Sequence, residues 1–123
     1  MLDSSAILAV ALREPGADAV VRIAASALMS SANLAEVLLV ASRKGLDSEA
    51  ICHDVLGLGL DIVPVTIGHA RIAAQIWRAH PTLNLSLGDK LCLALAFDKN
   101  AEIMTSDREM TRVGMDLTIT LFR

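Results

Sequence analysis

Short apolar runs along this chain alternate with longer stretches in which apolar residues recur at helical spacing. The short runs predict strands at residues 1–2, 27–31, 60–65, 101–105 and 115–122. The longer stretches predict helices at residues 5–12, 17–25, 34–44, 48–58, 67–77, 87–98 and 107–113. Strands that alternate with helices favour a mostly parallel sheet covered on both faces. The pattern therefore predicts an α/β protein, a three-layer α/β/α sandwich with about five strands, in a single domain that spans residues 1–123.

Polar and turn residues mark the expected ends of these elements. Asn33 is expected to cap the helix at 34–44, and Thr66 the helix that begins at residue 67, because both side chains accept hydrogen bonds from free backbone N–H groups. Gly45 follows the first of these helices, as a C-terminal cap does. Two residues are few for the first strand, which leaves two explanations open: a truncated strand, or a chain that starts further upstream.

Hydrophobic residues make up 54% of the chain, which exceeds the usual globular share. This share favours a well-buried core and an apolar surface that binds a partner or a second copy of the chain. The apolar runs are too short to span a membrane, and no positive charge precedes the first of them as in a signal peptide. We therefore expect a cytoplasmic protein with no membrane segment. Cys52 and Cys92 are isolated along the chain and are expected to be free thiols.

One carboxylate opens the most apolar helix. Asp89 precedes the apolar run at 91–96, where a lone carboxylate would be costly to bury, and Ser86 and Gly88 before it are cap and turn residues. An acid in the first turn of a helix is favoured by the helix dipole, so a capping role explains Asp89 as well as a functional one does. Three further acids occupy similar places, after a strand or early in an apolar helix: Asp3, Glu36 and Asp107.

The carboxyl ends of parallel strands meet at one edge of a sheet, so these four acids are expected to converge there. Converging carboxylates without Lys or Arg partners repel one another, and a divalent cation resolves this conflict. Mg²⁺ and Mn²⁺ prefer such oxygen ligands, and such an ion activates water for phosphodiester hydrolysis. The net charge of −3 would become +1 without the four acids, so the remaining surface need not repel RNA. With 2% aromatic residues and no Tyr, contact with RNA would rest on phosphate, metal and shape rather than on base stacking.

The four acids lie in four short segments, in order along the chain. These are residues 3–8 (DSSAIL), 33–37 (NLAEV), 87–89 (LGD) before the apolar run, and 105–108 (TSDR). In this order the segments resemble the PIN domain family, and more closely the toxin ribonucleases of VapBC-type toxin–antitoxin pairs. The resemblance covers nearly the whole chain, and it rests on the four segments together, since each alone is a weak signal.

The resemblance implies an endoribonuclease toxin that depends on Mg²⁺ or Mn²⁺ and hydrolyses RNA phosphodiester bonds. It also implies that a cognate antitoxin neutralises the protein, which forms a homodimer or a larger assembly with that antitoxin. By position, the metal-binding and catalytic acids would be Asp3, Glu36, Asp89 and Asp107. Ser5 and Thr105 match the positions of supporting hydroxyl groups near the site.

Two other functions stay open at this point. A receiver-like signalling domain also gathers acids around Mg²⁺ at strand ends, but it needs paired acids after the first strand, where this chain has Asp3 alone. A binding module that keeps the fold without catalysis is the second alternative. Cleavage of RNA with and without Mg²⁺ separates both from a nuclease.

Overall fold

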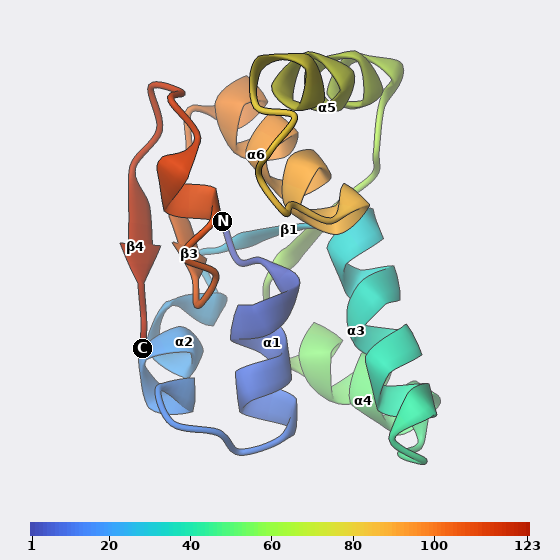
Figure 1. Cartoon of the computed structure of the whole chain (residues 1–123). Helices are drawn as coiled ribbons and strands as arrows, with labels where there is room; N and C mark the ends of the chain where they lie inside the picture. Colours follow the sequence, from blue (N-terminus) through green and yellow to red (C-terminus); the bar gives the residue numbers. More distant parts are fainter.

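The computed structural model describes all residues, 1–123, as four strands, six α-helices and one 3₁₀ turn (Figure 1). The strands are β1 (Leu28–Ser30), β2 (Asp61–Val63), β3 (Ile103–Thr105) and β4 (Ile119–Leu121). The helices are α1 (Ser4–Ala11), α2 (Ala17–Ala24), α3 (Ser31–Arg43), α4 (Ser48–Gly57), α5 (Ile67–Ala79) and α6 (Leu87–Lys99), with the 3₁₀ turn η1 at Met110–Arg112. No helix has the length and apolar character that crossing a membrane requires.

The strands form two parallel pairs, β1 with β2 and β3 with β4, and residues 1–3 run between the pairs. The N–H of Leu2 donates to the carbonyl of Leu28 at 2.9 Å, and the N–H of Met104 donates to the carbonyl of Met1 at 2.9 Å. Leu2 also forms an isolated parallel bridge with Met104. The predicted parallel α/β architecture is confirmed. The expected number of strands is too high, because residues 1–2 are too few to form more than one bridge.

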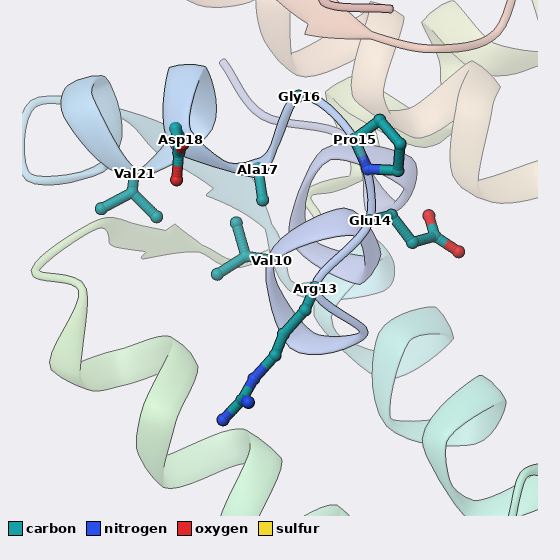
Figure 2. A pocket seen from close by; sticks show the side chains of 8 residues that line it. All are labelled: Val10, Arg13, Glu14, Pro15, Gly16, Ala17, Asp18 and Val21. Carbon is teal, nitrogen blue, oxygen red and sulfur yellow. The ribbon is translucent and has the colours of Figure 1, made fainter.

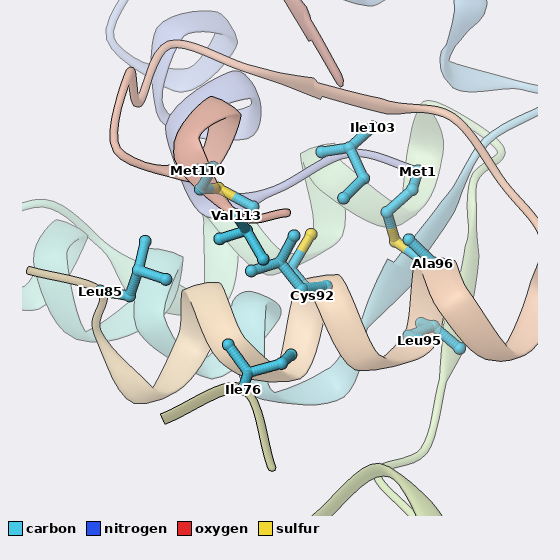
Figure 3. Packing of buried hydrophobic residues seen from close by; sticks show 10 residues of the cluster. Met1, Ile76, Leu85, Cys92, Leu95, Ala96, Ile103, Met110 and Val113 are labelled. Carbon is cyan, nitrogen blue, oxygen red and sulfur yellow. The ribbon is translucent and has the colours of Figure 1, made fainter. Parts of the chain in front are cut away.

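Two apolar cores pack on the opposite faces of this sheet. The α6 core contains Met1, Ile76, Leu85, Cys92, Leu93, Leu95, Ala96, Ile103, Met110 and Val113. The α1 core contains Leu2, Ala6, Ile7, Val20, Ala24, Ala27, Met29, Val37, Val55 and Leu60. Figure 3 shows Met1 and Ile103 on the side of α6 toward which Cys92 points. Met1 and Leu2 belong to different cores, as consecutive residues of an extended segment must when helices cover both faces.

The observed helix caps agree with the predicted ones in some places and not in others. Thr66 caps α5 as expected, since its side chain accepts a hydrogen bond from the N–H of His69. The cap predicted at Asn33 is wrong: Ser30, the last residue of β1, accepts from the N–H of Ala32 and starts α3 three residues earlier. This earlier start carries Asn33 into the helix, where its side chain is fully buried. The helix predicted at 107–113 shortens to η1.

Candidate active site

The site lies where the strands end. Asp3 follows the bridge at Leu2 and caps α1, Thr105 ends β3, and α3 begins directly after β1. In Figure 1 the first turns of α1, α3 and α6 gather at this edge. Parallel strands bring these segments together although they are far apart in the sequence, and this edge is where α/β proteins bind their ligands.

Asp3 is the buried member of the acidic set, with 2% of its surface exposed. Its Oδ1 accepts hydrogen bonds from the N–H of Ala6 at 3.1 Å and from the hydroxyl of Ser5 at 2.7 Å. Its Oδ2 accepts from the hydroxyl of Thr105 at 2.7 Å. Burial raises the pKa of Asp3 and the negative charge of Asp89 adds to this rise, while the three hydrogen bonds oppose it. We call Asp3, Ser5 and Thr105 the Asp3 network.

The Asp3 network also orders the segment after β3. Ser5 Oγ accepts a hydrogen bond from the N–H of Ser106 at 2.9 Å, and Thr105 Oγ1 accepts from the N–H of Asp107 at 2.9 Å. Asp107 is partly exposed, and its Oδ1 accepts from the N–H of Glu109 at 2.8 Å. No hydrogen bond reaches Asp107 Oδ2. The two hydroxyls thus join Asp3 to the backbone that carries Asp107.

Glu36 and Asp89 meet at the start of α6. Asp89 Oδ2 accepts from the N–H of Ser86 at 2.6 Å, and Ser86 Oγ accepts from the N–H of Asp89 at 3.0 Å, so the pair forms a capping box. The hydroxyl of Ser86 also donates to Glu36 Oε1 at 3.4 Å, and the hydroxyl of Ser4 donates to Glu36 Oε2. Asp89 Oδ1 receives no hydrogen bond. We call Asp89, Ser86 and Glu36 the Asp89 network.

No Lys, Arg or His forms an ion pair with any of the four candidate acids. The ion pairs of the chain are His53–Asp54, His69–Asp98, Lys99–Asp98, Arg112–Glu109 and Arg123–Glu14. Burial raises the pKa of the Cys92 thiol well above its ordinary value, and the charges of Asp3, Asp89 and Glu36 act in the same direction. The edge is therefore a region of uncompensated negative charge.

The donor set fits a hard divalent cation. Carboxylate, hydroxyl and amide oxygens surround the edge, whereas Cys92 stays a protonated, buried thiol and is no ligand for a soft metal. No group of three His, Cys, Asp or Glu side chains is close enough to hold one ion directly. The four acids do not form one inner coordination shell, so an ion at this edge would be held in part through water.

A hollow of about 630 Å³ lies at the turn between α1 and α2 (Figure 2). That hollow is lined by Val10, Arg13, Glu14, Pro15, Gly16, Ala17, Asp18 and Val21, which include none of the four candidate acids. A second groove, of about 450 Å³, runs between α5 and α6 and is lined mostly by apolar side chains. Trp77 lies in this groove and is 56% exposed, so it is no core residue.

Sequence analysis did not identify Ser4 and Asn33 as site residues. Ser4 is buried and binds Glu36, and Asn33 binds Ser4 and the carbonyl of Gly88. A signal was available for Asn33, since a residue three positions before Glu36 lies on the same face of a helix. Ser4 carries no comparable signal, because its role depends on the packing of α1 against α3.

The model of one protein family, the PIN domain, matches residues 1–115 of the chain. No curated protein sequence matches it.

Several solved structures share the fold. The DNA-bound VapBC from Salmonella typhimurium has 21% sequence identity over 100% of this chain and 97% of that chain, with a TM-score of 0.77. VapBC2 from Rickettsia felis, bound to a promoter DNA fragment, has 18% identity over 98% and 96%, with a TM-score of 0.75. VapC20 from Mycobacterium tuberculosis, described as a sarcin–ricin loop cleaving toxin, has 18% identity over 93% and 94%, with a TM-score of 0.69. At these identities, the likeness shows the fold.

Proposed function

The chain belongs to the PIN domain family, and from this membership and its acidic edge we propose that it is a metal-dependent endoribonuclease. It is the toxin of a toxin–antitoxin pair, hydrolyses RNA phosphodiester bonds, and is neutralised by a cognate antitoxin. The observation that carries this proposal is the set of four carboxylates at the strand ends, none of which has a cationic partner. A member of this family is not a receiver domain, so that alternative falls away.

The solved relatives support the biological role. Two of them are VapBC toxin–antitoxin complexes bound to DNA, and a third is described as a toxin that cleaves the sarcin–ricin loop. We transfer from them to this chain an antitoxin partner and an RNA substrate. The particular RNA is not transferred, because recognition would depend on surface residues that chains of such low identity do not share.

Each acid has a distinct part in the proposed chemistry. When bound, Mg²⁺ or Mn²⁺ activates water and neutralises charge on the phosphate. Asp3, Glu36 and Asp89 would hold the ion directly or through its waters, and Asp107 would hold it through water. Asp3 is fixed by its hydrogen bonds, so it offers its charge at one defined place. The free oxygens of Asp89 and Asp107 can orient the attacking water and accept its proton.

The antitoxin would reach this edge with a basic side chain, most effectively Arg, whose planar fork matches carboxylates. Such a side chain would replace the metal or obstruct the path of the RNA. Homodimer formation is supported by large apolar side chains that remain exposed on helices, such as Leu56 at 51%, Trp77 at 56% and Leu87 at 70%.

Cleavage of a structured RNA by the purified chain tests the proposal, with Mg²⁺ or Mn²⁺ and with a chelator. We expect cleavage only with the metal and its loss in Asp3→Asn. Cleavage that persists in chelator would contradict the metal dependence. No cleavage of any RNA by the wild type, with metal present and antitoxin absent, would favour the binding module without catalysis.

A further inference from the structure

One buried amide side chain joins the three helices that carry or follow Asp3, Glu36 and Asp89. Asn33 lies in α3 and is 0% exposed. Its Nδ2 donates to the hydroxyl of Ser4 in α1 at 2.9 Å and to the carbonyl of Gly88 in α6 at 3.3 Å. Few buried side chains of this chain are polar, and the partners of Asn33 lie 29 and 55 residues away along the sequence. The contacts therefore fix how α1, α3 and α6 lie relative to one another.

Each partner of Asn33 is next to a candidate acid. Ser4 follows Asp3 directly, and Gly88 precedes Asp89 directly. Asn33 itself stands one helical turn before Glu36. A displacement of this one amide would thus be transmitted to three of the four acids.

The orientation of the amide determines what the hydroxyl of Ser4 can do. The carbonyl of Gly88 can only accept a hydrogen bond, so Nδ2 and not Oδ1 must face it. The same Nδ2 donates to Ser4, so the one hydroxyl proton of Ser4 is left for an acceptor. Glu36 is the nearer of its two acceptors, since the backbone carbonyl of Asn33 lies at 3.3 Å. Asn33 thereby favours a hydrogen bond from Ser4 to the carboxylate of Glu36.

Stability alone does not account for an amide at this place. Asn33 Oδ1 is buried and has no hydrogen-bond partner, and it is the one buried side-chain polar atom of the chain in that condition. Burying such an atom costs free energy, which an apolar side chain of similar size would avoid. The amide is therefore better explained by what its nitrogen positions.

The fit between α3 and α6 is close at the same point. A Cβ on Gly88 would run into the carboxylate of Glu36, so only glycine lets this carboxylate lie against the first turn of α6. Small shifts of either helix would change the distance between Glu36 and Asp89.

We propose that Asn33 is a positioning residue, which through Ser4 and Gly88 holds the carboxylates of Glu36 and Asp89 at the spacing that a hydrated divalent cation requires. The inference rests on the proposed function and adds to it a residue that touches neither metal nor RNA. It assigns Asn33 an effect on metal affinity that exceeds its effect on folding.

The test compares Asn33→Leu with Val55→Ala, a cavity-forming change in α4 at a residue of the α1 core that belongs to neither the Asp3 network nor the Asp89 network. Binding of Mn²⁺ alone is measured by isothermal titration calorimetry, and folding by circular dichroism and denaturant unfolding. We expect the dissociation constant for Mn²⁺ to rise about tenfold in Asn33→Leu, comparable to the loss of a supporting residue around a metal. Val55→Ala should bind Mn²⁺ as the wild type does, although it lowers stability more.

Cleavage kinetics provide a second measurement. In Asn33→Leu the Mn²⁺ concentration for half-maximal cleavage should rise while the KM for RNA stays unchanged. Ser4→Ala should have a smaller effect in the same direction, because the contact of Asn33 with Gly88 remains, and the double variant should be no worse than Asn33→Leu alone. Additive losses would contradict the route through Ser4.

The outcomes separate this inference from the proposed function. A wild type that neither binds Mn²⁺ nor cleaves RNA contradicts the proposed function. A wild type that does both, with unchanged Mn²⁺ affinity in Asn33→Leu, overturns the inference. If Asn33→Leu does not fold, Ser4→Ala carries the test, and wild-type Mn²⁺ affinity in that variant has the same meaning.

Discussion

The Asp3 network and the Asp89 network lie at one edge of the sheet but differ in how far they bury and bond their carboxylates. Asp3 is buried, and both of its oxygens accept hydrogen bonds from the protein. Asp89 is partly exposed, and only one of its oxygens does so. The first carboxylate is held in place, whereas the second keeps an oxygen for a ligand. In the proposed active site, Asp3 would thus be the anchor and Asp89 the acid that faces the bound ligand.

The same comparison removes an apparent conflict between capping and catalysis. Asp3 caps α1, and Asp89 belongs to the capping box of α6. Each carboxylate uses an oxygen to satisfy the first turn of its helix, and this fixes the direction of the side chain. A capping role and a functional role are therefore compatible in the same residue.

The largest expected effect is that of Asp3→Asn. The variant keeps the size of the side chain but removes the anchored charge, and we expect cleavage to fall about 10²-fold or more. Cleavage of a structured RNA with Mg²⁺ measures this loss. Asp61→Asn is the matched control, because Asp61 is exposed in β2 and belongs to neither network. Equal cleavage by wild type and Asp3→Asn would mean that this edge is not the active site.

Asp3→Asn should also change how stability depends on pH. Burial raises the pKa of Asp3 above its ordinary value, so between the two values the folded chain holds a proton that the unfolded chain has lost. The free energy of unfolding therefore falls as pH rises through this window, and it stays lowered above it. Urea unfolding is measured over a pH series with chelator present. As pH rises, the free energy of unfolding should fall less for Asp3→Asn than for wild type.

Asp89→Asn is expected to lose cleavage by about 10²-fold as well, through weaker metal binding. Because Asp89 is partly exposed and an amide oxygen can still accept from Ser86, its stability should change by less than about 0.5 kcal/mol. Glu36→Gln should resemble Asp89→Asn, and Asp107→Asn should lose less. Urea unfolding of the four variants separates the buried acid from the partly exposed ones, since only Asp3→Asn should gain stability at neutral pH.

Thr105→Val tests the anchor without changing the acids. It keeps the shape of the side chain but removes the hydroxyl that donates to Asp3 and accepts from Asp107. We expect a loss of about 1.5–3 kcal/mol in stability, as for a hydrogen bond to a charged group. Without that donor the pKa of Asp3 rises further, so the pH–rate profile should move to higher pH. An unchanged profile would mean that Thr105 supports the fold alone.

The smallest expected effect concerns two Gly→Ala variants, whose changes in stability should have opposite signs. Gly→Ala in the middle of a helix usually stabilises by about 0.5–1 kcal/mol, and Gly57→Ala, at the last residue of α4, should stabilise by up to about 0.5 kcal/mol, because nothing lies within 4 Å of its added Cβ. Gly88→Ala should destabilise instead, because its Cβ meets the carboxylate of Glu36, which would have to leave its hydrogen bonds with Ser4 and Ser86. Melting temperatures of the two variants decide this, and a stabilised Gly88→Ala would show that Glu36 can move away freely.

Local signals in the sequence predicted much of this arrangement. The alternation of strands and helices was enough to predict the layered fold. The acids at expected strand ends and helix starts were enough to predict the candidate site. Asn33 shows why the rest could not be predicted. Ser30 and Asn33 are both good caps, and only the path of β1 decides which of them starts α3. The role of Asn33 then depends on Ser4 and Gly88, which only the folded chain brings near it.

The position of residues 1–3 in the middle of the sheet has a consequence for synthesis. The ribosome makes this segment before the strands on either side of it, yet Asp3 receives a hydrogen bond from Thr105, 102 residues later, and Met1 receives one from Met104. Residues 1–3 can therefore form their backbone hydrogen bonds with β3 only after β3 has been made. A nascent chain that has not yet emerged as far as β3 lacks the Asp3 network. An organism that makes this protein would thus be exposed to its proposed nuclease activity only after the ribosome has made β3.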